Sequence, residues 1–217
     1  MTFVGFNEYA ALIGSDEAGK GEWLGPLTVA AVALSSPQSS YLVTQGVMDS
    51  KKLKLDRILE LAKIIESSCL SYHVITISPK SFNRLMNEVK GEGRSLNDIL
   101  AWGHAEAIAD VFEELMKKGI FGKIKLSIDM FDKIKTEIRL KRVLDLKRFE
   151  LNHRPKAERE TSVAAASIMA RFVRELWIDE KSRDLNLDLR KLSVLDAKSN
   201  PYAESFAKIS FLSKRVK

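Results

Sequence analysis

The chain has 217 residues, of which 45% are hydrophobic and 29% charged, and its formal net charge is +6. These values predict one large folded domain, or one domain with an appendage, and exclude a wholly disordered chain. The chain has a single cysteine, no apolar run near the ~20 residues of a membrane span and no signal-peptide pattern, so we expect a cytoplasmic protein that contacts no membrane.

The predicted elements alternate between strands and helices. Residues 10–13 and 27–34 are apolar runs separated by glycine-rich turns, and together they predict a buried hairpin. The later patterns predict, in chain order, a helix at 55–67, a strand at 71–78, a helix at 96–117, a strand at 123–129, a weak strand at 142–151, a helix at 161–178 and then shorter helices. This order predicts an α/β fold, with a mixed sheet because the first two strands are antiparallel.

The charge is unevenly distributed along the chain. Residues 1–50 hold one basic and five acidic side chains, whereas residues 133–159 hold ten basic and four acidic ones. A basic body around an acidic pocket suits an enzyme that acts on a polyanion through bound cations. A solvated, lysine-rich surface is the alternative, and the charge alone leaves both interpretations open.

The strongest local motif is GSDEAGKG, residues 14–21. It contains the G-x-x-x-x-G-K spacing of a phosphate loop, but Gly21 stands where that loop needs a hydroxyl, and two carboxylates would repel phosphate. Two interpretations remain. Asp16 and Glu17 hold a metal ion at a strand end, or they are solvated acids in a turn, which this segment alone favours.

Two further acids lie at element boundaries. Asp129 ends the alternating strand at 123–129, where α/β enzymes place functional groups. Glu158 precedes the alanine-rich helix, although an acid there is also explained by the helix dipole. With Asp16 and Glu17, they are the four carboxylates that a two-cation phosphodiester site needs. Adjacent residues of a regular strand point to opposite faces, so we expect the first pair to share a site only if the strand breaks at the glycine turn.

The segments GSDEAGKGEWLGPLTVAAVAL, MDSKKL, SIDMF and KAERETSVAAASIMAR resemble the signature segments of the type 2 ribonucleases H, in order from about residue 11 to 180. These proteins cleave the RNA strand of RNA–DNA hybrids. Glu158 as the fourth acid, the stretch 87–107 with Asn97 and His104, and the ending AKISFLSKR are similar to ribonuclease HIII rather than to its near relative ribonuclease HII. The resemblance implies a ribonuclease H-like mixed β-sheet flanked by helices. We expect a catalytic core at 1–180 and a C-terminal helical segment at 181–217, packed on or next to it.

The resemblance also implies a site and a mechanism. The catalytic and metal-binding residues would be four acids that hold two Mg²⁺ or Mn²⁺ ions: Asp16, Glu17, Asp129 and Glu158. The products would carry 5′-phosphate and 3′-hydroxyl ends. The substrate, a hybrid duplex or ribonucleotide-containing DNA, would contact a second set: Gly19, Lys20, Gly21, Ser50, Lys51 and Asn97. We expect a monomer, in which His104 is packed or at the surface rather than catalytic.

Two departures from the family pattern bear on the substrate. The triplet Gly19-Lys20-Gly21 is more often Gly-Thr-Gly in ribonuclease HIII, and its basic middle residue is closer to the Gly-Arg-Gly of ribonuclease HII. The alternative function is therefore an HII-like nuclease that incises at single ribonucleotides embedded in duplex DNA. Ribonuclease HIII proteins also usually carry an N-terminal substrate-binding domain. About ten residues precede the first predicted strand, so we expect that domain to be absent and affinity to come from the basic body, the C-terminal segment or a partner.

Overall fold

The computed structural model describes residues 9–129, 132–154 and 157–213. Its centre is a five-stranded sheet with the order β3-β2-β1-β4-β5. The strands are β1 (Ala11–Ala18), β2 (Leu27–Leu34), β3 (Ser71–Ile77), β4 (Ile124–Asp129) and β5 (Phe149–Arg154). β2 pairs antiparallel with both β1 and β3, whereas β4 pairs parallel with β1 and with β5, which confirms the predicted mixed sheet and hairpin.

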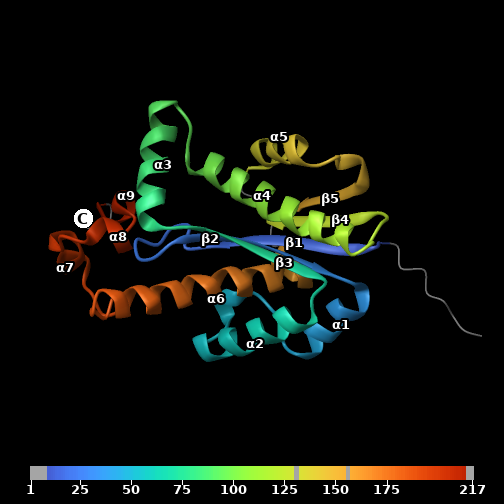
Figure 1. Ribbon diagram of the computed structural model, residues 1–217, viewed down its shortest axis with the longest axis horizontal. Helices are drawn as coiled ribbons and strands as arrows, with labels where there is room; N and C mark the ends of the chain where they lie inside the picture. Colours follow the sequence, from blue (N-terminus) through green and yellow to red (C-terminus); the bar gives the residue numbers. More distant parts are fainter. Residues whose placement is uncertain (1–8, 130–131, 155–156, 214–217) are drawn as a thin grey trace, which may run out of the picture.

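Helices cover both faces of the sheet (Figure 1). The α-helices are α1 (Ser36–Thr44), α2 (Leu55–Ser68), α3 (Pro79–Gly91), α4 (Leu96–Lys117), α5 (Lys133–Val143), α6 (Thr161–Asp184), α7 (Val194–Ser199), α8 (Ala203–Phe206) and α9 (Ile209–Leu212). The described residues also form short 3₁₀ turns, η1 (Ser50–Lys52), η2 (Leu146–Arg148) and η3 (Ala157–Arg159). The helices α1, α2 and α6 lie on one face and α4 and α5 on the other. None of the described helices has the length and apolar character needed to cross a bilayer.

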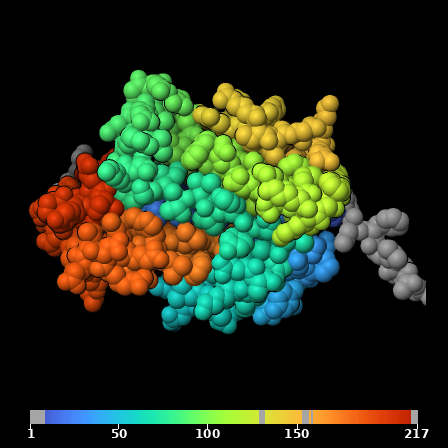
Figure 2. Space-filling view, in the orientation of Figure 1, coloured from blue at the N-terminus to red at the C-terminus, as the bar shows by residue number. Residues whose placement is uncertain are grey.

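The C-terminal helices gather at one end of the molecule. Figure 2 shows residues near the C-terminus, in red, against α6 and the base of α3. A separate apolar cluster forms there, with Trp23 from the β1–β2 connection packed among residues of α6 to α9. The C-terminal segment is therefore in contact with the loop that follows β1.

One predicted strand differs from the structure. Residues 142–148 are the end of α5, a short connection and η2, and the strand β5 begins only at Phe149. Asp132 caps α5, since its side chain accepts a hydrogen bond from the amide of Lys135, and Leu140 is buried. The local capping signal and this amphipathic packing outweigh the β-leaning composition of the segment. Three helices, α1, α3 and α5, were not predicted, although α1 and α3 each have a capping serine and a proline in the first two helical positions.

The alanine-rich helix α6 packs directly on β1. A Cβ atom at Gly14 would lie 2.2 Å from the carbonyl carbon of Ser162 and from the amide nitrogen of Val163. Glycine at this position therefore permits backbone-to-backbone contact between the central strand and the first turn of the helix. The close approach positions η3, which directly precedes α6, beside the sheet.

Candidate active site

A polar cavity of about 330 Å³ lies at the C-terminal end of β1. Its walls come from β1, the β1–β2 loop (residues 19–26), η1 and α6. The cavity brings together seven of the residues predicted from the sequence: Asp16, Glu17, Gly19, Lys20, Gly21, Ser50 and Lys51. Three residues of α6 that the sequence did not single out also line it: Arg171, Arg174 and Glu175.

Asp16 lies on the face of β1 that packs against α6. Burial, followed by the neighbouring charge of Glu17, raises the pKa of Asp16 to about 7, against a weaker opposing hydrogen bond from Ser167. The amide of Glu17 also donates to Asp16 Oδ1 at 2.9 Å. A carboxylate with so little water around it is costly when charged, so this position is suited to a cation.

Glu17 faces the opposite side of the sheet, toward α4. Burial alone would raise the pKa of Glu17, but the hydrogen bond and charge of His104, together with Lys20, lower it to about 2. His104 Nε2 lies 3.2 Å from Glu17 Oε2, and Lys20 Nζ lies 3.2 Å from Glu17 Oε1. Glu17 is therefore held as a carboxylate at neutral pH.

His104 is fully buried and connects Glu17 to the strand. Its Nδ1 lies 2.7 Å from Ser15 Oγ, and the Ser15 hydroxyl donates to the carbonyl of Ala30 at 2.7 Å. Because that proton is used, Nδ1 donates to Ser15, and the ring is fixed with Nε2 toward Glu17. The expectation of a packed residue holds, but the sequence missed the contact of His104 with an acid of the site.

The expectation that Asp16 and Glu17 share a site only if β1 breaks at the glycine turn is wrong. The strand stays paired with β2 up to Ala18, so Asp16 and Glu17 point to opposite faces as in any regular strand. Both still line one cavity because the described pairing of β1 with β4 ends at Ser15 and Ile128, and the last residues of β1 extend beyond that ladder.

The other two predicted acids are placed by their backbones. Asp129 is the last residue of β4, next along the strand from Ile128, which is level with Ser15 of β1. Glu158 is in η3, directly before α6. The side chains of both acids, and residues 130–131 and 155–156, lie outside the described part of the structure. Their roles as ligands stay predictions.

Of the predicted substrate-binding residues, all but Asn97 line the cavity. Ser50 is buried, with its Oγ 2.7 Å from Ser167 Oγ, whereas Lys51 is exposed at the cavity. Asn97 donates to Asp132 Oδ2 at 3.3 Å and is not among the described residues that line the cavity. Its predicted contact with substrate stays untested by this arrangement.

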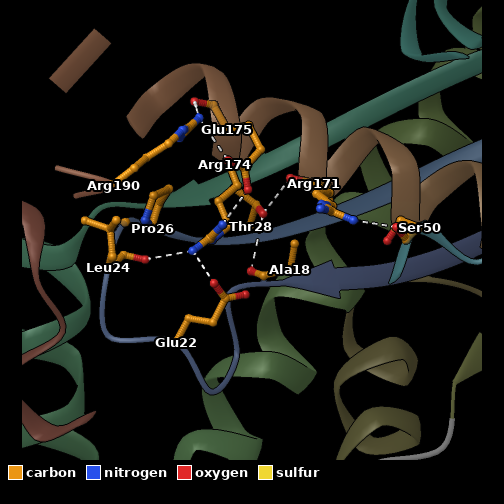
Figure 3. Close-up of polar contacts among 12 residues, drawn as sticks. Ala18, Glu22, Leu24, Pro26, Thr28, Ser50, Arg171, Arg174, Glu175 and Arg190 are labelled. Atoms are coloured by element: carbon orange, nitrogen blue, oxygen red, sulfur yellow. Dashed lines mark hydrogen bonds and ion pairs between the residues drawn. The ribbon is translucent and has the colours of Figure 1, made fainter. Parts of the chain in front are cut away.

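Two arginines of α6 contact the loops around the cavity (Figure 3). Arg171 Nη1 donates to the carbonyls of Ser50, at 2.5 Å, and Leu53, at 3.2 Å. Arg174 extends to the β1–β2 loop instead. The two arginines are three residues apart, so they lie on one side of the helix, a spacing that sequence alone does not distinguish from a solvated face.

The fold and the site together define an α/β protein of the ribonuclease H type, with paired carboxylates at the end of its central strand. The sequence profile described as Ribonuclease HII matches residues 13–211. The chain belongs to the ribonuclease HII family, which confirms the resemblance to the type 2 ribonucleases H.

Relatives named Ribonuclease HIII are similar over most of the chain. The protein of Protochlamydia amoebophila (strain UWE25) is 38% identical over 181 residues, which is 82% of this chain and 56% of the relative. That of Chlamydia pneumoniae is 36% identical over 180 residues, 81% of this chain and 56% of the relative. The chain thus spans about half the length of the curated relatives it matches.

A solved structure agrees with these relatives. The crystal structure of Bst-RNase HIII in complex with Mn²⁺ matches with a TM-score of 0.79 and 25% identity, covering 97% of this chain and 70% of that chain. The likeness to ribonuclease HIII predicted from the sequence is confirmed.

Proposed function

We propose that the protein is an endonuclease that hydrolyses the RNA strand of RNA–DNA hybrids with the help of divalent metal ions. The observation that carries the proposal is the half-buried acid pair of Asp16 and Glu17 in a polar cavity with basic residues at its rim. Such a pair is stabilised by a cation, and the rim suits a polyanion. The similarity to proteins named Ribonuclease HIII, one of them solved with Mn²⁺, supports the proposal.

The donor set fits Mg²⁺ or Mn²⁺. Carboxylate oxygens are the ligands that hard cations prefer, and the raised pKa of Asp16 is the sign of a charge that lacks compensation. Asp16 and Glu17, with Asp129 and Glu158, would hold two ions. Bound there, the ions would activate a water and stabilise the leaving 3′-oxygen, which gives 5′-phosphate and 3′-hydroxyl ends.

The remaining residues bind and orient the substrate. Lys51 at the cavity binds backbone phosphate, and the backbone of Gly19-Lys20-Gly21 contacts the 2′-hydroxyl that distinguishes RNA from DNA. His104 orients Glu17 from the opposite face of the sheet. That the protein acts as a monomer stays a prediction.

A second candidate is incision at single ribonucleotides in duplex DNA. It is favoured by the basic residue Lys20 in the glycine triplet and by the match to the ribonuclease HII profile. The two functions use the same acids and differ in how many consecutive ribonucleotides the loop requires.

Cleavage of three matched duplexes tests the proposal. With Mn²⁺ or Mg²⁺ we expect cuts in an all-RNA strand paired with DNA and none in an all-DNA duplex, because the loop reads the 2′-hydroxyl. EDTA should abolish cleavage, and mass spectrometry should find 5′-phosphates. Cleavage only of a duplex with one embedded ribonucleotide would replace the first candidate by the second. Metal-independent cleavage, or none of any duplex, would contradict both.

Salt dependence of binding tests the role of Lys51. Counterion release makes hybrid affinity fall steeply with salt, and Lys51→Gln should make the slope of log K against log[salt] less steep by about one. Lys52→Gln is the matched control, since Lys52 is an exposed neighbour that is not among the described residues lining the cavity. Equal slopes for the two variants, measured by fluorescence anisotropy with Ca²⁺, would remove Lys51 from the phosphate contacts.

A further inference from the structure

The β1–β2 loop is paired with the C-terminal segment, residues 203–212. Two backbone hydrogen bonds, from the amide of Gly25 to the carbonyl of Phe206 at 2.9 Å and from the amide of Lys208 to the carbonyl of Trp23 at 2.7 Å, form an antiparallel bridge between Leu24 and Ala207. The stem of the loop thus depends on residues that are far away in the sequence.

Lys208 contacts the same loop through its side chain. It is fully buried, and its Nζ donates to the carbonyls of Gly25, at 2.6 Å, and Pro26, at 3.3 Å. The ammonium also lies 5.7 Å from the ring centroid of Phe82. Burial, followed by the charge of Arg174, lowers the pKa of Lys208 to about 7, although Glu22 opposes the shift. Burying a lysine costs free energy, so the burial of Lys208 points to a structural role for its hydrogen bonds to the loop carbonyls.

Arg174 supports the loop from α6 (Figure 3). Its Nη2 donates to the carbonyl of Leu24 at 3.0 Å and to Glu22 Oε2 at 2.5 Å, and its side chain is only 7% exposed. A Cβ at Gly19 would lie 3.1 Å from Arg174 Nε and 2.4 Å from the carbonyl of Pro26. The glycine triplet therefore rests on the arginine and on the carbonyl that Lys208 also contacts.

The C-terminal segment is fixed in turn by α3. Asn83 Nδ2 donates to the carbonyl of Ala207 at 3.0 Å, and Asn83 Oδ1 accepts from the amide of Ile209 at 2.9 Å. Asn83 thus contacts the residues on both sides of Lys208. The chain of contacts runs from α3 through the C-terminal segment to the loop.

We propose that Lys208 and Arg174 are positioning residues for RNA recognition, because they fix the backbone of the β1–β2 loop from two sides. The inference rests on the proposed function of that loop. Glycine-rich loops have many accessible conformations, and reading a hydroxyl with backbone atoms requires one of them to be selected. The C-terminal segment then contributes to the substrate site through the loop, although none of its residues is among the described residues that line the cavity.

Lys208→Met tests the proposal, since methionine fills a similar space without a donor. We expect KM for a hybrid to rise about tenfold while kcat changes less than twofold, because the acids are untouched. The ratio of the affinity for an RNA–DNA hybrid to the affinity for an all-DNA duplex should fall toward one. The phosphate contacts remain in the variant, whereas recognition of the 2′-hydroxyl is lost. Amides of residues 19–25 should exchange hydrogen faster, and those of α4 should not.

Three further variants are matched to it. Arg174→Lys keeps the charge but loses the paired donors, so its loss of selectivity should be intermediate. Asn83→Ala removes two hydrogen bonds to the C-terminal segment, and within the described part of the chain Asn83 forms no hydrogen bond to the loop itself. This variant should also lower the selectivity for the hybrid. Arg190→Gln is the control: Arg190 belongs to the same charged cluster through Glu175 and Asp179, at 2.9 and 3.0 Å, and should leave selectivity unchanged.

The outcomes separate this inference from the proposed function. Equal weakening of both duplexes, faster exchange throughout α4, or an effect of Arg190→Gln as large as that of Lys208→Met would show a general structural role and overturn it. If the unmodified protein neither binds nor cleaves hybrids, the proposed function fails. Hydrogen exchange in residues 19–25 would then still decide whether Lys208 fixes the loop.

Discussion

Asp16→Asn is expected to reduce metal-dependent cleavage by a factor on the order of a thousand and to stabilise the metal-free protein. The loss follows from removing a proposed anionic ligand of the metal ions, which would contribute several kcal/mol to the reaction; a loss of ~4 kcal/mol corresponds to about a thousandfold. The gain follows because Asp16 is a poorly solvated, half-buried carboxyl group next to the charge of Glu17. A gain of ~1–2 kcal/mol would raise Tm by roughly 3–6 °C in EDTA.

The pH dependence of stability identifies the cause of that gain. The pKa of Asp16 is raised on folding to about 7, so the folded metal-free protein binds more protons than the unfolded chain between about pH 4 and 7. Its free energy of unfolding therefore falls as pH rises through this range, and this component is missing in Asp16→Asn. Glu17, with its pKa lowered to about 2, contributes the opposite slope below pH 4.5 in both proteins. The advantage of the variant should grow from pH 4 to 7 and then level off.

A matched control is Asp110→Asn on α4, an acid outside the cavity whose half-exposed side chain pairs with His73. It should cleave like the unmodified protein and gain no stability in EDTA. Mn²⁺ should raise the Tm of both the unmodified protein and Asp110→Asn, but not that of Asp16→Asn. A variant of Asp16 that cleaves at the normal rate would remove this acid from the site.

Gly14→Ala is expected to destabilise the protein by about 3 kcal/mol or more, which lowers Tm by roughly 6–12 °C. The added Cβ would lie 2.2 Å from backbone atoms of Ser162 and Val163, so relief requires the first turn of α6 to move away from β1. Denaturant unfolding measures the loss. Cleavage should fall as well, since Ser167, which hydrogen-bonds Asp16, is on the same helix.

Gly91→Ala is the control for this substitution. Gly91 is the last residue of α3, and a Cβ there meets nothing within 4 Å. Alanine should be neutral or stabilise by up to ~1 kcal/mol through helix propensity. Similar stabilities for the two alanine variants would mean that α6 does not depend on close contact at Gly14.

The sequence could identify acids that lie at the end of a predicted strand. Asp16 and Asp129 each follow an apolar strand pattern, and in an α/β sheet this places them near one edge. What the pattern could not show is that Asp16 and Glu17 face opposite sides of an unbroken strand and still share a cavity. That depends on where the ladder with β4 ends, which is a property of the sheet and not of either segment.

The supporting residues were not predictable for a different reason. Arg171 and Arg174 contact carbonyls that are 118 to 150 residues away, and His104 contacts Glu17 across 87 residues. Arginine on a helix and a histidine among alanines have the same local appearance whether they are solvated, packed or positioning. Lys208 is a stronger example, because nothing in its surrounding sequence distinguishes a fully buried lysine from a surface one.

The pairing of the β1–β2 loop with residues 206–208 also sets an order for biosynthesis. Lys208 is synthesised 183 residues after Gly25, whose carbonyl it contacts. The hydrogen bonds between the loop and residues 206–208 can form only after these residues have been synthesised, later than the hairpin itself and later than Arg174 of α6, the other partner of the loop. Premature termination just ahead of Ala203 would leave the strands of the sheet in place and remove the partner of the loop.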